Sequence, residues 1–285
     1  MRSVDVRMDF VRTNQNADGG WGYFPGRESR VEPTSYALRA LGTNESQWGK
    51  GIDFLNARRQ PDGGIAPSPS VPGSTWVTSL AFPLLKRAGV KQLDTLANWI
   101  LNTEGAEGGF AQRLFYILGK AAVDQDPKLK GWPWRPGNNS WVEPTAHALL
   151  ALHWMGDDVP EAGIRHRRQM GAKMLLDRRT STKGWNYGNK KVLGEILPSY
   201  PETTGIALMG LAKSGVNAEE SYALAQDYLK NSKGALGLTL LTIGLRLNNQ
   251  SARYEASEQL HPSRNIMLAS LEILAERETP GAFLP

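Results

Sequence analysis

The sequence predicts an all-α protein built from repeated helical hairpins, and three observations lead to that class. First, three segments align without gaps and share a Glu-x-Thr start followed by apolar residues at helical spacing. Second, short glycine-rich turns follow other helical patterns, and glycines both stop helices and allow tight reversals. Third, no segment keeps the period-two alternation of a half-buried strand. The three aligned segments are VEPTSYALRAL at 31–41, VEPTAHALLAL at 142–152 and PETTGIALMGL at 201–211.

Each Glu-x-Thr segment has the features of a helix start. Pro33 and Pro144 fall in the expected first turn, where the missing N–H costs nothing. Apolar residues then recur at intervals of three and four, which gives one buried stripe. Two further segments are weaker copies: STWVTSLAFPLL at 74–85, with Trp76 in place of the acid, and GALGLTLLTIGLRL at 234–247.

A second helical element precedes these segments and ends in a polar turn with glycines. We expect Gln15 to cap a helix end in the first copy and to lie on Trp21. A hairpin of the two elements cannot bury both of its faces alone, so neighbouring hairpins must stack. The copies of this element are 10–21, 54–65, 99–110, 175–185 and 228–237, the last two much altered.

The two kinds of helix suit two layers. The small-residue Glu-x-Thr helices suit a crowded inner layer, whereas the charged segments 162–179 and 218–233 suit an outer ring. The segment 110–122 also has a helical pattern, and the sequence leaves its layer open. A chain of 285 residues, 40% of them hydrophobic, can bury one large core, so we expect a single domain over 1–285.

Composition excludes several functions. The chain has no cysteine, which excludes disulfides, thiolate nucleophiles and cysteine-ligated zinc. The histidines at 147, 153, 166 and 261 lack metal-ligand spacing, and no nucleotide-binding glycine pattern is present, so we expect neither a metal nor a cofactor. The first ten residues have no apolar stretch, and no run reaches about 20 apolar residues. We therefore expect a cytoplasmic protein without a secretion signal.

The net charge of +5 comes partly from basic clusters. These clusters can contact an anionic membrane surface, or they can simply form a solvated helix face. No nucleic-acid motif accompanies them, so we expect no nucleic-acid partner. The basic clusters are 165–168, 177–183 and 190–191.

Two of these patterns resemble a known family. Gln15, Gly19 and Trp21 resemble the QW motif of squalene–hopene and oxidosqualene cyclases, and the Thr-Ala-x-Ala-Leu helices resemble the prenyltransferase/squalene-oxidase repeat. The resemblance covers roughly residues 1–250. It implies an α/α toroid of about six helix pairs, in which an inner ring of helices lies inside an outer ring.

The resemblance also implies a position for a catalytic acid. Class II cyclases of that family carry an Asp-x-Asp-Asp-Thr-Ala motif at the start of an inner helix, and its middle Asp donates a proton. Glu143, two residues before Thr145, takes that position here. Trp141 and Pro144 replace the neighbouring acids, and the chain has room for one of the two helical domains of the large cyclases. The DQDP stretch at 124–127 looks like an acid pair but is more typical of a solvated turn.

If the inner helices start at the same end of a ring, three acids and many aromatic side chains meet at one mouth. Such an aromatic cup can stabilise a carbocation by about 0.5–2 kcal/mol per ring, or it can stack a sugar or hold a flat apolar ligand. Each acid can also be a mere helix cap, stabilised by roughly 0.3–1 kcal/mol. The acids are Glu32, Glu143 and Glu202, and the candidate binding residues are Trp21, Tyr23, Trp134, Trp141, His147, Trp185, Tyr187 and Tyr200.

The leading hypothesis is a class II type isoprenoid cyclase that acts on a small apolar ligand. Glu143 donates a proton to an alkene or epoxide, Glu32 or Glu202 tunes it or takes the proton back, and the aromatic residues shield the cation. Two alternatives stay open. One is a non-enzymatic toroid that binds an apolar or glycan ligand, alone or with a partner subunit. The other is a glycan hydrolase or lyase, which needs two carboxyls about 5–9.5 Å apart.

Overall fold

The computed structural model covers the whole chain and describes residues 3–109, 117–118, 124–255, 263–277 and 280–285. The chain divides into two compact units, one formed by Met1–Ile100 with Arg253–Pro285 and the other by Leu101–Ala252. The expected helix at 110–122 lies outside the described residues except for positions 117 and 118. A single domain over 1–285 stays a prediction.

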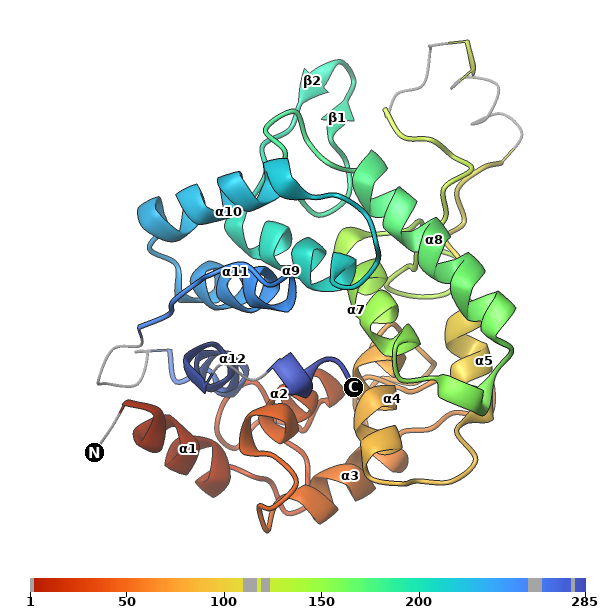
Figure 1. Cartoon of the computed structure of the whole chain (residues 1–285). Coiled ribbons are helices and arrows are strands. Elements are labelled where there is room, and N and C mark those ends of the chain that lie inside the picture. Colours follow the sequence, from red (N-terminus) through yellow and green to blue (C-terminus); the bar gives the residue numbers. More distant parts are fainter. Residues whose placement is uncertain (1–2, 110–116, 119–123, 256–262, 278–279) are drawn as a thin grey trace. The chain divides into compact units, whose positions relative to one another are not determined.

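The first unit contains one row of inner helices and helices packed on its outside (Figure 1). Helices α12, α2 and α4 lie side by side in that order, α1 packs on α12 and α2, and α3 packs on α2 and α4. The helices of this unit are α1 (Ser3–Thr13), α2 (Val31–Leu41), α3 (Trp48–Asn56), α4 (Thr78–Arg87), α5 (Asp94–Asn102), α12 (Ile266–Arg277) and the short η2 (Pro280–Ala282).

The second unit repeats this arrangement. Helix α9 lies between α7 and α11, α8 packs on α7 and α9, and α10 packs on α9 and α11 (Figure 1). Its elements are α7 (Val142–Leu152), η1 (Gly156–Asp158), α8 (Glu161–Asp177), β1 (Lys191–Val192), β2 (Glu195–Ile196), α9 (Pro201–Leu211), α10 (Glu219–Asn231) and α11 (Ala235–Leu247).

Burial separates the two layers as the sequence predicts. In α2 every residue from Pro33 to Leu41 is buried, so this helix has neighbours on all sides. In α10 the buried residues are Ser221 and Ala225, whereas the four charged side chains of this helix are exposed. The Glu-x-Thr helices are inner helices, and α8 and α10 are outer helices.

Close approach between inner helices depends on glycine. A Cβ built on Gly210 of α9 would lie 2.5 Å from the Cα of Ala146 in α7. A Cβ on Gly244 of α11 would lie 2.5 Å from the carbonyl oxygen of Gly205 in α9. Ala146 and Gly205 hold the same position in the aligned repeats, so both neighbouring pairs cross with the same stagger. This identifies α11 as the fifth copy of the repeat, as predicted.

Strands β1 and β2 form an antiparallel hairpin that the sequence did not predict. Each strand has two residues, which is too short for an alternating pattern to be recognised. Among the residues that the structure describes, no helix combines the length and the apolar character needed to cross a bilayer.

Candidate functional site

One hydrogen bond recurs at the start of four inner helices. A threonine hydroxyl accepts the main-chain N–H of the residue that follows the glycine turn, over 2.8–3.1 Å. The threonine of the Glu-x-Thr pattern is therefore the attachment point of that turn. The pairs are Thr34 with Trp21, Thr78 with Ile65, Thr145 with Trp132, and Thr204 with Trp185.

A main-chain bond then places the loop of the next repeat beside the helix start. In the second unit the N–H of Val142, the first residue of α7, donates to the carbonyl of Tyr187 over 3.0 Å. Tyr187 lies in the loop that leads into α9. Helices α7 and α9 therefore begin at the same end of this unit, and Glu143 and Glu202 both lie in first turns at that end.

The same link occurs twice in the first unit. Val31 N–H donates to the Pro67 carbonyl over 2.9 Å, and Ile266 N–H donates to the Tyr23 carbonyl over 2.8 Å. The second bond gives α12 the place of an inner helix, although it carries no Glu-x-Thr pattern. Sequence reasoning missed this helix because the link is made by main-chain atoms, which no side-chain motif encodes.

We call Glu143, Glu202, Tyr187 and Tyr200 the acid corner. The Tyr187 hydroxyl donates to Glu202 over 3.4 Å, which is a long hydrogen bond. The rings of Tyr187 and Tyr200 lie 5.6 Å apart at an angle of 40°. Both tyrosines are solvent-accessible, with 52% of Tyr187 and 37% of Tyr200 exposed. The corner thus exposes two phenol rings to solvent beside two half-buried glutamates.

Electrostatics at the corner keep the Tyr187 phenol protonated. Burial raises the pKa of Tyr187, and the negative charges of Glu202 and Glu143 raise it further. At neutral pH the phenol is therefore a neutral hydrogen-bond donor, and its ring is free of formal charge.

The first unit contains a second acid–tyrosine pair. The Tyr23 hydroxyl donates to Glu32, as Tyr187 donates to Glu202. Burial raises the pKa of Glu32, and the Tyr23 hydrogen bond and the charge of Arg30 oppose that rise. The expectation that all three acids share one mouth stays a prediction, because Glu32 and the acid corner belong to different units.

Two of the expected ligand-binding tryptophans hold the repeats together. Trp21 and Trp185 are completely buried. Their indole N–H groups donate to the carbonyls of Val11 over 2.8 Å and Leu175 over 2.6 Å, each in the preceding helix. Gln15 differs from its expected role as a cap. Its amide donates to the Gly19 carbonyl in the glycine turn and to the Gln47 carbonyl just before α3. These side chains pack the hairpin itself.

Other expected binding residues belong to helix α7, which carries Glu143, or to the loop before it. Trp134 and Trp141 are half-buried, and His147 is buried one turn after Glu143 in α7. A Cβ on Gly188 would lie 3.3 Å from the Trp141 ring, so this indole packs on the loop that carries Tyr187. Trp141 thus contacts the residue that follows Tyr187 of the acid corner.

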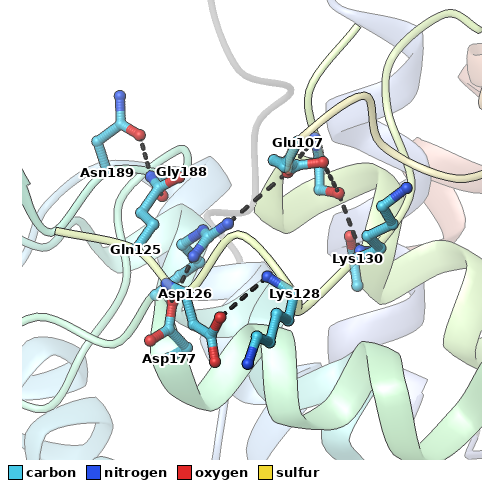
Figure 2. A network of polar contacts seen from close by, with 12 residues as sticks. Glu107, Gln125, Asp126, Lys128, Lys130, Asp177, Gly188 and Asn189 are labelled. Atoms are coloured by element: carbon cyan, nitrogen blue, oxygen red, sulfur yellow. Dashed lines mark hydrogen bonds and ion pairs between the residues drawn. The ribbon is translucent and has the colours of Figure 1, made fainter. Parts of the chain in front are cut away.

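A buried polar network that sequence reasoning missed lies behind the start of α7 (Figure 2). Glu107 accepts the main-chain N–H of Ser140 over 2.6 Å and its hydroxyl over 3.0 Å. Arg178 is completely buried, pairs with Glu107 at 3.7 Å and bonds Asp177. A serine three residues before each acid is the signal that could have revealed this contact; the serines are Ser29, Ser140 and Ser199.

The basic clusters are partly used inside the protein. Arg167 is buried with its guanidinium 4.0 Å from the centre of the Trp132 ring, and Arg178 belongs to the polar network. Arg165, His166 and Lys191 are exposed. Within the described ranges no group of three or more acidic or histidine side chains is arranged to hold a metal ion.

Comparisons with known proteins show the fold of the chain and a short stretch of sequence similarity. No family model matches the chain. The chain has the helical fold of type II terpene cyclases: it aligns with MstE from Scytonema, bound to geranylgeranyl dihydroxybenzoate, over 98% of this chain and 97% of that chain, with 15% identity and a TM-score of 0.61. The expected α/α-toroid class and the resemblance to terpenoid cyclases are thereby confirmed.

Two further similarities bear on function. A stretch of 67 residues, 22% of the chain, is 36% identical to drimenyl diphosphate synthase from Streptantibioticus cattleyicolor, and it spans 13% of that protein's length. A family 8 endoglucanase from Klebsiella pneumoniae aligns over 95% of this chain and 97% of that chain, with 13% identity and a TM-score of 0.61. Fold likeness alone therefore does not separate a cyclase from a glycan hydrolase.

Proposed function

We propose that the protein is an isoprenoid cyclase whose reaction begins with protonation by Glu143. The observation that carries this proposal is the position of Glu143. It lies in the first turn of an inner helix, one residue after Val142, whose N–H donates to the Tyr187 carbonyl, and it matches the sequence position of the proton donor in the resembled class II cyclases. The 67-residue similarity to drimenyl diphosphate synthase supports it.

The chemistry that this corner offers is a proton transfer followed by carbon–carbon bond formation. The Glu143 proton adds to a terminal alkene carbon or an epoxide oxygen, and neighbouring double bonds close rings onto the resulting cation. Loss of a proton from the final cation ends the reaction. If Glu143 takes this proton the enzyme is restored at once; if Glu202 takes it, Glu202 releases the proton to solvent and Glu143 regains one from solvent before the next turnover. The net reaction is an isomerisation, so it needs no oxidant or cofactor.

The aromatic side chains supply the environment that this reaction needs. An apolar substrate against Trp134, Trp141 and the two tyrosines excludes water from Glu143 and from the cation that its proton creates. Each ring face attracts the cation by about 0.5–2 kcal/mol. The neutral Tyr187 phenol holds Glu202 by a hydrogen bond without adding a nucleophilic anion beside the cation.

Glu32 is a second candidate for the proton donor. Its pKa is raised by burial, which is the property that a general acid needs near neutrality. Single Gln variants of Glu32, Glu143 and Glu202 separate the roles: the donor variant loses the reaction, and a tuning residue slows it.

A glycan hydrolase is the second candidate function, because the family 8 endoglucanase matches as well as the cyclases do in fold. Its mechanism needs two carboxyl groups across one glycosidic bond. Glu143 and Glu202, at the same end of adjacent helices, offer such a pair. Release of reducing ends from soluble β-glucans is the assay for this function.

The remaining expectations stay predictions. They are a cytoplasmic location and contact with an anionic membrane surface through exposed basic residues such as Arg165 and Lys191. A vesicle-flotation assay with and without anionic lipid measures the contact. Binding of an isoprenoid without turnover is the non-enzymatic alternative.

The test of the proposed function is a product screen. The purified protein is incubated with linear polyprenols, polyprenyl diphosphates, squalene and geranylgeranyl dihydroxybenzoate, and the products are separated by chromatography and identified by mass spectrometry. We expect at least one cyclic isomer that a Glu143→Gln variant does not form. If wild-type protein forms no cyclic product from any of these substrates, the proposal fails.

A further inference from the structure

The third repeat along the chain, whose inner helix is α7, carries an additional segment at its glycine turn. In the first repeat, Asp18 of the turn accepts the hydroxyl of Ser29 over 2.7 Å. In the third repeat, Glu107 accepts the hydroxyl of Ser140 over 3.0 Å, so Glu107 is the equivalent turn acid. In the first repeat two glycines separate Asp18 from Trp21. In the third, an insertion at 108–130 lies between Glu107 and Trp132. This repeat is also the one that carries Glu143.

The described end of that insertion, residues 124–130, lies against the loop of the fourth repeat. The Gln125 amide donates to the Gly188 carbonyl over 2.8 Å and also to the Asn189 side chain. Figure 2 shows Gln125 pointing at these two residues. An ion pair between Asp124 and Lys190 at 3.7 Å joins the same two segments.

The insertion is itself held by the end of α8. The main-chain N–H of Asp126 donates to Asp177 over 3.2 Å, and Asp177 also pairs with Lys190 at 3.6 Å. Asp177 continues into the buried Arg178–Glu107 network (Figure 2). Gln125 therefore reaches the loop from a segment that is fixed at its base.

The loop that Gln125 contacts is the one that presents Tyr187. On its other side, Val142 N–H donates to the Tyr187 carbonyl over 3.0 Å, and Trp141 packs on Gly188. Contacts from the start of α7 and from the insertion thus both hold the main chain of this loop. The Tyr187 ring itself is half exposed, so the direction of its phenol depends on how this main chain is fixed.

We infer that Gln125 is a positioning residue: its hydrogen bonds to Gly188 and Asn189 fix the loop that directs Tyr187 toward Glu202 and Glu143. The consequence for catalysis rests on the proposed function, whereas the positioning of Tyr187 does not. The third-repeat insertion thereby contributes to the acid corner. The DQDP stretch at 124–127 positions the Tyr187 loop and is not only a solvated turn.

The test follows Tyr187 directly. Protein labelled with carbon-13 at the tyrosine Cζ gives signals from eight tyrosines, and a Tyr187→Phe variant assigns the one that belongs to Tyr187. A pH titration then measures the Tyr187 phenol in wild type and in Gln125→Met, which keeps the length of the side chain but cannot donate. We expect the midpoint of Gln125→Met to fall toward the ordinary value of a tyrosine, because the phenol moves away from the two carboxylates.

Two control variants make the result specific. Lys128→Ala changes an exposed side chain on the same segment, and Gln15→Met removes an amide bonded to main-chain carbonyls in the other unit. We expect neither to move the Tyr187 midpoint. An unchanged midpoint in Gln125→Met, or an equal shift in Gln15→Met, overturns the inference.

Kinetics supply a second readout once a cyclised substrate is known. A misdirected Tyr187 should lower kcat by about tenfold while KM stays within about twofold, since geometry and not apolar binding is lost. Equal losses in Lys128→Ala contradict the inference. Should wild type cyclise nothing, the titration still decides the role of Gln125, so the two failures are distinguishable.

Discussion

Replacing Thr145 with valine tests whether the threonine bond organises the repeat. The Thr145 hydroxyl accepts the main-chain N–H of Trp132 over 2.9 Å, and both residues are buried. Valine keeps the shape of threonine but has no acceptor. The buried Trp132 N–H then loses this acceptor, and the Trp132 carbonyl loses the longer hydrogen bond of 3.5 Å from the same hydroxyl.

The expected cost follows from that orphaned donor. Leaving a buried donor unsatisfied costs about 1–3 kcal/mol in the free energy of unfolding. Thr242→Val is the matched control, because Thr242 is equally buried in an inner helix of the same unit. Its hydroxyl donates to the Leu238 carbonyl over 2.8 Å, an acceptor that the helix already pairs. Its loss should cost less than about 0.5 kcal/mol.

Equilibrium unfolding in urea, followed by circular dichroism at 222 nm, measures both variants. We expect the transition of Thr145→Val to move to lower urea with an unchanged slope, by clearly more than that of Thr242→Val. If the two variants lose the same stability, the Thr145 hydroxyl contributes no more than an ordinary helical hydroxyl. That result would contradict its role in organising the repeat.

Three further outcomes follow from the structure. Gly210→Ala should cost about 1–3 kcal/mol of stability, because the new Cβ meets Ala146. Gly49→Ala on the outer α3 should gain about 0.5–1 kcal/mol, because a Cβ there meets no other atom within 4 Å. Urea unfolding compares the two variants. Burial lowers the pKa of His153 to about 4, so stability should fall as the pH drops below about 6.5, and His153→Phe should flatten that slope in thermal melts. Glu32→Gln should stabilise the fold at pH 7.5 but not at pH 4, because burial raises the pKa of Glu32 and so penalises its carboxylate only at the higher pH; a gain at pH 4 as large as at pH 7.5 contradicts this.

The inner helices were predictable because one local pattern encodes each of them. The segments 31–41, 142–152 and 201–211 begin and end as the sequence predicts, since the acid, the threonine and the apolar stripe all lie within eleven residues. Burial on all sides and the glycine contacts follow from the same small residues. Helix α12 has no such pattern, and its place follows from its packing on α2 and from the Ile266–Tyr23 main-chain bond.

The candidate site was predictable only where its residues lie close in sequence. The start of α7 brings together Trp141, Glu143 and His147. The loop before the start of α9 carries Tyr187 and Tyr200. The polar network could not be predicted, because Glu107 reaches Ser140 across the insertion at 108–130 and Gln125 reaches Gly188 in another repeat. Such contacts depend on tertiary packing, whereas spacing along the chain shows only which residues share an element.

The proposed function depends on Glu143 as the source of the proton that starts a cyclisation. The most direct measurement is to run the reaction in deuterium oxide with wild type and Glu143→Gln, and to weigh the product by mass spectrometry. We expect a cyclic product of wild type that carries one deuterium, and a rate at least about 100-fold lower for Glu143→Gln. A cyclic product without deuterium, or a Glu143→Gln variant as fast as wild type, would contradict it.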